Sequence, residues 1–168
     1  MQNNSSQGFF KTYKVILILF TYLLLMSSLF SIFDHDLPVY QEFMYTLMGL
    51  FFIIFSFFKV IHLKEFQESF ILYDPIAKYI PFYGYLYPFL ELVLGSMFIG
   101  GVYIFIISTI TIIILTSTTI GIITKLRHGE ILECACLGVV FNLPLSKVTV
   151  FENSLMILMA LMAVIRFS

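Results

Sequence analysis

Two cysteines separated by a single residue are the most reactive feature of this sequence. Cys134-Ala135-Cys136 sets two thiols close enough to form a tight, strained disulfide ring, or to bind one soft metal ion through two thiolates. Isolated free cysteines are commonly small buried hydrophobes. This pair instead lies in a polar segment flanked by glycines, which runs KLRHGEILECACLGVVFNLPLSK from 125 to 147. The pattern predicts redox chemistry or soft-metal binding at Cys134 and Cys136.

A second set of polar residues interrupts the apolar runs. Glu91, preceded by Tyr87, lies deep in one run, where an ionised carboxyl is costly without a partner. It is either functional or a protonated or Tyr-bonded carboxyl that packs two helices together. Lys59 and His62 stand one turn apart at the end of another run, where a long cation ordinarily reaches out to the interface and where proton or metal transfer is the functional alternative. These four residues are the intramembrane candidates.

The composition identifies the solvent around these residues. Of the 168 residues, 60% are apolar and only 11% are charged, which is far outside the range of soluble proteins. The formal net charge of −1 provides no basic surface for nucleic acid. No zinc-finger spacing, glycine-rich phosphate loop or Ser/His/Asp arrangement is present. The sequence therefore predicts an all-α integral membrane protein whose surroundings are the lipid bilayer.

Apolar runs predict about five transmembrane helices. The first, 15–33, is longer than the core of a cleaved signal peptide, which is about 7–15 residues, so we expect an uncleaved anchor. The second begins at about Phe43. The run from 78 to 125 has the length of two spans joined at Gly100-Gly101. The last, 148–165, includes Glu152 and has only a short uncharged part.

Two segments differ from these simple apolar runs. Residues 63–81 are mixed in polarity, have aromatic side chains at helical spacing and are broken by prolines, so they predict an interfacial helix in which Asp74 caps the part that follows it. The fourth run, VYIFIISTITIIILTSTTIGIIT, is rich in Ile and Thr and would favour a strand in water. An open strand in hydrocarbon leaves its backbone groups unpaired, so we expect a helix.

The cations predict the orientation of the five-span arrangement. Eight of them fall on one side, namely Lys11, Lys14, Lys59, Lys64, Lys78, Lys125, Arg127 and Lys147, and only Arg166 falls on the other. Because cytoplasmic segments carry the excess of Lys and Arg, the N-terminus, the segment 63–81 and the Cys-x-Cys loop are predicted to be cytoplasmic.

A family resemblance rests on four features in order. These are Phe58-Lys59 at the end of a span, an amphipathic segment with a Tyr, the run PFLELVLG around Glu91, and the loop CACLG around the cysteines. Together they resemble the MauE/DoxX family of redox-associated membrane proteins, and most of all its methylamine utilisation MauE branch. The resemblance covers roughly 43–165. It implies a four-helix transmembrane bundle, preceded here by a polar tail (1–14) and an additional N-terminal transmembrane helix (15–33).

The resemblance also implies a function in thiol or disulfide handling, or in maturation of a disulfide-rich partner protein. It makes Cys134 and Cys136 the redox pair and places Glu91 and Lys59 in the bundle interior beside them. We expect a multi-pass protein of the bacterial inner (cytoplasmic) membrane. A single cysteine pair cannot relay electrons across the bilayer, so redox chemistry requires a thiol-bearing partner protein or a quinone cofactor.

Two other classes of function stay open from the sequence. Cys134 and Cys136 could receive a soft metal ion such as Cu(I), Hg(II) or Zn(II), in a carrier or in an accessory that serves a metal-binding partner. Alternatively, the chain is a structural membrane subunit with inert thiols.

Overall fold

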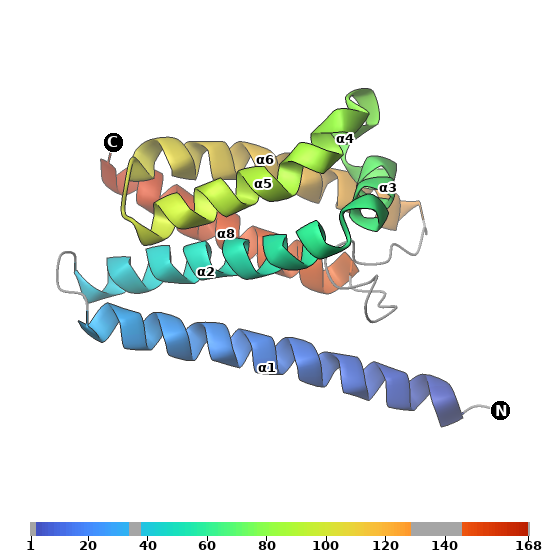
Figure 1. Ribbon diagram of the computed structural model, residues 1–168, viewed down its shortest axis with the longest axis horizontal. Helices are drawn as coiled ribbons and strands as arrows, with labels where there is room; N and C mark the ends of the chain where they lie inside the picture. The colour runs from blue at the N-terminus through green and yellow to red at the C-terminus, as the bar shows by residue number, and fades with distance from the viewer. Residues whose placement is uncertain (1–2, 34–37, 129–145, 168) are drawn as a thin grey trace.

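The computed structural model describes residues 3–33, 38–128 and 146–167, and every element in these ranges is a helix. The helices are α1 (Asn3–Phe33), α2 (Val39–Ile61), α3 (Leu63–Tyr73), α4 (Pro75–Tyr79), α5 (Pro81–Ile99), α6 (Ile104–Arg127) and α8 (Ser146–Phe167), as shown in Figure 1. The all-α class predicted from the sequence is therefore confirmed.

Four of these helices are long and apolar enough to cross a membrane. They are α2, α5, α6 and the part of α8 from Thr149 to Arg166. The run that contains Glu152 thus has the length and hydropathy of a span in spite of its carboxyl. The chain is an integral membrane protein with a four-helix bundle, and α1, whose apolar part includes Leu17–Phe33, is an additional helix in front of it.

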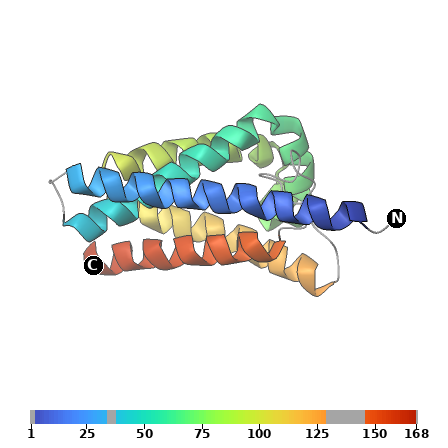
Figure 2. The same cartoon turned by 90° about the horizontal axis from the view of Figure 1, so that it is seen from below.

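The long helices run lengthwise beside one another, and the two short ones lie at one end of the bundle. α2 packs on α5 and on α1, and α6 packs on α8. Figures 1 and 2 both place α3, α4 and the beginning of α1 at the same end as the C-terminus of α6 and the beginning of α8. The C-terminus of α8 lies at the opposite end. The predicted cation-rich segments therefore share one end of the molecule.

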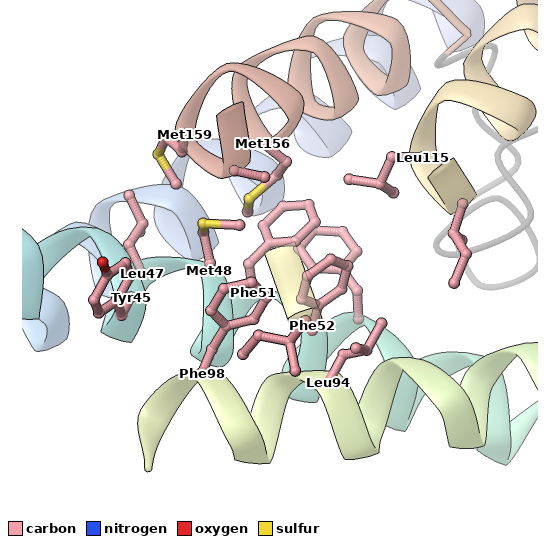
Figure 3. Close-up of a cluster of buried hydrophobic side chains, with 14 of the residues drawn as sticks. Tyr45, Leu47, Met48, Phe51, Phe52, Leu94, Phe98, Leu115, Met156 and Met159 are labelled. Carbon is pink, nitrogen blue, oxygen red and sulfur yellow. The ribbon is translucent and has the colours of Figure 1, made fainter. Parts of the chain in front are cut away.

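Aromatic and methionine side chains fill the centre of the bundle. Figure 3 shows Phe51 and Phe52 of α2 between Phe98 of α5 and Met156 of α8. The ring centroids of Phe52 and Phe98 are 6.2 Å apart, and all four side chains are buried. Buried apolar contacts of this kind fix the α2–α5 pair against α8.

Glycines allow α2 and α5 to approach closely. A Cβ atom on Gly49 would lie 2.8 Å from the carbonyl oxygen of Gly95, and a Cβ atom on Gly95 would lie 2.8 Å from the carbonyl oxygen of Gly49. Both distances are shorter than real Cβ atoms tolerate. Small residues at such crossings are the usual device for close helix packing in membranes, where lipid supplies no hydrophobic force between helices.

The Ile- and Thr-rich run is a helix, α6, as expected for a segment in hydrocarbon. Its threonine hydroxyls donate to backbone carbonyls four residues earlier: Thr109 to Phe105, Thr119 to Leu115 and Thr124 to Ile120. These bonds satisfy the hydroxyl groups within the helix itself. Strand propensity is therefore overridden by the need of the backbone for internal hydrogen bonds.

Segment 63–81 forms two helices, α3 and α4, which are separated at the break predicted for Pro75, and Pro81 begins α5. Asp74 lies between α3 and α4 and is buried, with 1% of its surface exposed. Its Oδ1 accepts hydrogen bonds from the backbone amides of Ile76 and Ala77, both at 2.9 Å. Its Oδ2 accepts a third from the Thr118 hydroxyl of α6 at 3.0 Å. The predicted cap is confirmed, and it also ties this corner to α6.

Asp74→Ala is expected to lower the free energy of unfolding by about 1–2 kcal/mol, because two helix-capping bonds are lost. Asp74→Asn should lose less, since its side-chain oxygen still accepts from the two amides. Unfolding in mixed micelles measures the difference. The exposed Glu68, replaced by Gln, is the matched control on α3. An Asn variant as unstable as the Ala variant would show that the bond from Thr118, and not the cap, dominates.

Candidate functional site

A buried ion pair joins α2 to α5 near the end of the bundle where α3 and α4 lie. Lys59 Nζ donates to both carboxylate oxygens of Glu91, at 2.6 Å and 2.5 Å. The Ser56 hydroxyl donates to Glu91 Oε2 at 2.8 Å. Lys59 is 5% exposed and Glu91 is 3% exposed. The carboxylate therefore has three donated hydrogen bonds within a site that is closed to the surroundings.

Helical spacing explains why these side chains meet. Ser56 and Lys59 are three residues apart on α2, and Tyr87 and Glu91 are four apart on α5, so each pair lies on one face of its helix. The Lys59 ammonium lies 4.9 Å from the centre of the Tyr87 ring and 5.4 Å from that of Phe66 on α3. Aromatic faces attract a cation at such distances. The Glu91 carboxylate and the faces of these two rings therefore all contact the ammonium.

The ion pair forms part of the wall of a small cavity of about 30 Å³. Phe66 and Phe70 of α3, Thr118 of α6, and Glu152 and Asn153 of α8 also line it. Asn153 Nδ2 donates to the Thr119 hydroxyl at 3.2 Å, which connects α8 to α6. A volume of this size suits about one or two water molecules and is too small for an organic cofactor.

The buried charges of Lys59 and Glu91 can be tolerated only when both are present. Removing two charges from water costs several kcal/mol per ion, and only a well-formed pair with further hydrogen bonds offsets that cost. Here the Ser56 hydroxyl supplies a further hydrogen bond to the carboxylate and the two rings supply further contacts to the ammonium. The cluster of Ser56, Lys59, Tyr87 and Glu91, termed the ion-pair cluster below, is therefore a rigid connection between two spans.

The ion-pair cluster lies at the end of the bundle from which the cysteine segment leaves. α6 ends at Arg127 and α8 begins at Ser146, and both positions are at this end in Figures 1 and 2. The chain between them carries Cys134 and Cys136, which lie outside the described residues. Glu152 and Asn153 in the early part of α8 line the same cavity as Lys59.

The structure brings together three of the predicted intramembrane residues and leaves one apart. Lys59, Tyr87 and Glu91 are in contact, as described above. His62 caps the junction of α2 and α3 and does not line the cavity. The expectation that Lys59 reaches out to the membrane interface is wrong, because its ammonium is buried against the Glu91 carboxylate. The expectation drawn from the family resemblance, that Lys59 and Glu91 lie in the bundle interior, is confirmed.

Sequence reasoning missed several contributors to the site, three of which are polar residues on α2 and α8. Ser56 bonds to Glu91, and Asn153 and Glu152 line the cavity. The spacing Ser56-x-x-Lys59 was a usable signal, because two polar residues one turn apart in an apolar run share a face. The adjacent Glu152 and Asn153 were another, since polar residues inside a span usually face the bundle interior.

A larger hollow opens at the other end of the bundle. It has a volume of about 470 Å³ and is mainly apolar, with Met44 of α2 and Met159 and Met162 of α8 among its lining residues. Arg166 lies over the ring of Tyr40 at 5.0 Å. From Tyr40 to Lys59 the helix rises roughly 28 Å, at about 1.5 Å per residue. This hollow is therefore distant from the ion-pair cluster.

Metal ligands do not gather within the part of the chain that the structure describes. No group of three or more His, Cys, Asp or Glu residues with the arrangement of a metal site occurs among residues 3–33, 38–128 and 146–167. The soft-metal hypothesis therefore depends on Cys134 and Cys136 themselves.

Comparison with known proteins gives one informative result. The family model described as methylamine utilisation protein MauE matches residues 37–166, which include α2 to α8 and the Cys-x-Cys segment but not α1. No curated protein and no solved structure matches the chain. The match extends over well more than half of the sequence and coincides with the four-helix bundle. The chain belongs to the MauE family of membrane proteins.

Proposed function

We propose that this protein is a membrane accessory that exchanges thiols and disulfides with a partner protein through Cys134 and Cys136. The observation that carries the proposal is the presence of a Cys-x-Cys pair in a chain of the MauE family, whose description places it in methylamine utilisation. The two helix ends that flank the pair, the end of α6 and the beginning of α8, lie at the same end of the bundle as the ion-pair cluster.

The proposed exchange is balanced in both directions. With Cys134 and Cys136 reduced, one thiolate attacks a partner disulfide, forms a mixed disulfide and releases a partner thiolate. The second thiolate then attacks the first sulfur, so the partner leaves as a dithiol and the pair becomes a disulfide, having given up two electrons. With the pair oxidised, two partner thiolates perform the same two attacks in reverse and take the disulfide. A ring with one intervening residue is strained, which favours its transfer.

The ion-pair cluster has a positioning task in this proposal. Lys59 and Glu91 neutralise each other and are enclosed, so neither is presented to a thiol. Their contribution is to fix α2 against α5 at the end of the bundle where α6 ends and α8 begins.

A partner protein is a better acceptor for the electrons than a quinone in the large hollow. Thiol–disulfide exchange requires contact between the sulfur atoms and their acceptor. The apolar hollow near Tyr40 and Arg166 lies at the end of the bundle opposite to that where the cysteine segment begins and ends. The cavity beside Lys59 is too small for a quinone ring.

Single cysteine variants test the proposal. Cys136→Ser and Cys134→Ser each leave one thiol that can form a mixed disulfide but cannot resolve it. We expect one of them to accumulate a covalent adduct with a partner, seen on non-reducing gels and removed by reductant. The double Ser variant is a cysteine-free control, because the chain contains only two cysteines. Absence of any adduct, together with soft metal bound stoichiometrically and lost on Cys136→Ser, would replace exchange by metal handling.

The side of the membrane sets the direction of the exchange. The excess of cations at this end favours a cytoplasmic location, where thiols are kept reduced, so the pair is expected to donate electrons there. Labelling intact cells with an impermeant and then a permeant maleimide, with and without prior reduction, measures both side and oxidation state. Reaction with the impermeant reagent only after reduction would place the pair outside and make it a disulfide donor.

A further inference from the structure

The large hollow at the C-terminal end of α8 takes no part in the proposed thiol exchange. Its volume of about 470 Å³ lies in the range of sites that hold small organic ligands. Most of its wall consists of apolar side chains of α2 and α8, among them Phe43, Met44, Met159 and Met162. Met162 is 49% exposed, so the hollow is open to the surroundings of the bundle. An occupant must therefore be mainly apolar, as a lipid acyl chain is.

A cation also lines this hollow. Arg166 is exposed, and its guanidinium carbon lies 5.0 Å from the centre of the Tyr40 ring. An aromatic face attracts a cation without a directed hydrogen bond, so the planar fork of N–H donors on the guanidinium can still bind an anion. Phosphate oxygens accept two parallel hydrogen bonds from such a fork. The hollow thus combines an apolar wall with one anion-binding group.

The charge of Arg166 stands apart from other charges at this end of the bundle. Among the residues that the structure describes, no Asp or Glu lines the hollow. Glu42, on the first turn of α2, is 8% exposed and lies outside its wall. The sequence has no Lys or Arg in 15–58 or in 79–124, the stretches that include the other helix ends at this side. Any preference for a lipid with an anionic head here therefore depends on Arg166.

We propose that the large hollow binds an anionic phospholipid, with one acyl chain between α2 and α8 and the phosphate on Arg166. The depth of the residues supports this choice. Arg166 is the last residue of the apolar span of α8, Thr149–Arg166, so it lies at the level of the lipid head groups. Met162 and Met159 are about one and two turns earlier on α8, at the level of the acyl chains. A phospholipid carries its phosphate and its apolar chain in that order.

Quenching of a single tryptophan by brominated lipid tests the proposal, because the chain contains no Trp of its own. Met162→Trp places the fluorophore in the hollow. The full-length variant is reconstituted into mixed vesicles of phosphatidylglycerol and phosphatidylcholine, with brominated acyl chains on one lipid or on the other. We expect phosphatidylglycerol to bind about fivefold more tightly, the contribution of roughly one cation near an anionic lipid. Adding Arg166→Gln should abolish this preference, and Arg166→Lys should retain part of it.

Ile110→Trp is the matched control, since Ile110 is 37% exposed, lies within two turns of the start of α6 at the same end of the bundle, and does not line the hollow. It should be quenched equally by the two brominated lipids. Equal quenching at position 162, or a preference that persists with Arg166→Gln or is shared by position 110, overturns the proposal. Quenching by neither lipid at 162, with normal quenching at 110, also overturns it and would assign the hollow to a protein occupant such as a second copy of the chain. The unfolding transition of each variant checks its fold.

Discussion

Lys59→Met is expected to lower the free energy of unfolding by about 3–5 kcal/mol, the cost of leaving one charge of a buried pair without its partner. The Glu91 carboxylate would retain only the hydroxyl of Ser56 as a donor from the cluster, inside a site where it is 3% exposed. Glu91→Gln should cost a similar amount, because the buried ammonium then loses the charge of the Glu91 carboxylate. Unfolding in mixed micelles, followed by circular dichroism, measures both. Lys64→Met, an exposed lysine on the next helix, is the control and should change stability little.

The double variant with Lys59→Met and Glu91→Met measures the interaction between the two charges separately from the effect of losing either one. Replacing a buried ion pair by apolar residues is often neutral or even stabilising, so the double variant should return to within about 1 kcal/mol of the wild type. The resulting coupling energy would be far larger than that of an exposed pair. Single variants no worse than the Lys64 control would contradict the enclosed geometry of the cluster.

The stability and the proposed exchange can be measured independently in these variants. If the cluster positions the cysteine segment, the double Met variant should fold and still form the partner adduct through Cys134 or Cys136. The single variants should lose adduct and stability together. An adduct lost in a stably folded double variant would instead assign the pair a direct part in the chemistry.

The spans and their class could be predicted from the sequence because lipid imposes a simple rule. An apolar run in the bilayer must be helical to satisfy the hydrogen bonds of its backbone. The helices α2, α5 and α6 therefore follow from length and hydropathy, and this includes the Thr-rich α6. Gly100-Gly101 marked the turn between α5 and α6, and Gly101 has a φ of +63° there. Pro75 marked the break between α3 and α4 in the same way, because the residue before a proline is disfavoured in a helix.

The direction in which the polar side chains point could not be predicted from length and hydropathy. Lys59 near a helix end is as consistent with reaching the interface as with turning inward, and the choice depends on Glu91, which is 32 residues away. Hydropathy indicates that both are buried in a span but not which helices are neighbours. The pairing of α2 with α5 is set by close contacts such as Gly49 with Gly95, which depend on three-dimensional approach.

Gly121→Ala is expected to destabilise the corner between α3, α4 and α6 by about 3 kcal/mol, the upper part of the range for overpacking. A Cβ atom at this position would overlap the backbone carbonyl oxygen of Tyr73 and lie 3.1 Å from Pro75 Cδ. Backbone cannot rotate away as a flexible side chain can, so the end of α3 must move. That movement would also strain the bond from Thr118, one turn earlier on α6, to Asp74.

Gly100→Ala is the matched control, since its Cβ atom would meet nothing nearer than 3.4 Å and its φ is −75°. We expect Gly121→Ala to unfold at clearly lower denaturant and to expose the α3–α4 segment to limited proteolysis, while Gly100→Ala behaves as wild type. The two substitutions add the same methyl group to the same residue type, so a shared effect would reflect helix propensity or chain entropy. An effect restricted to Gly121 would confirm that close contact between α6 and the main chain at Tyr73 holds this end of the bundle together.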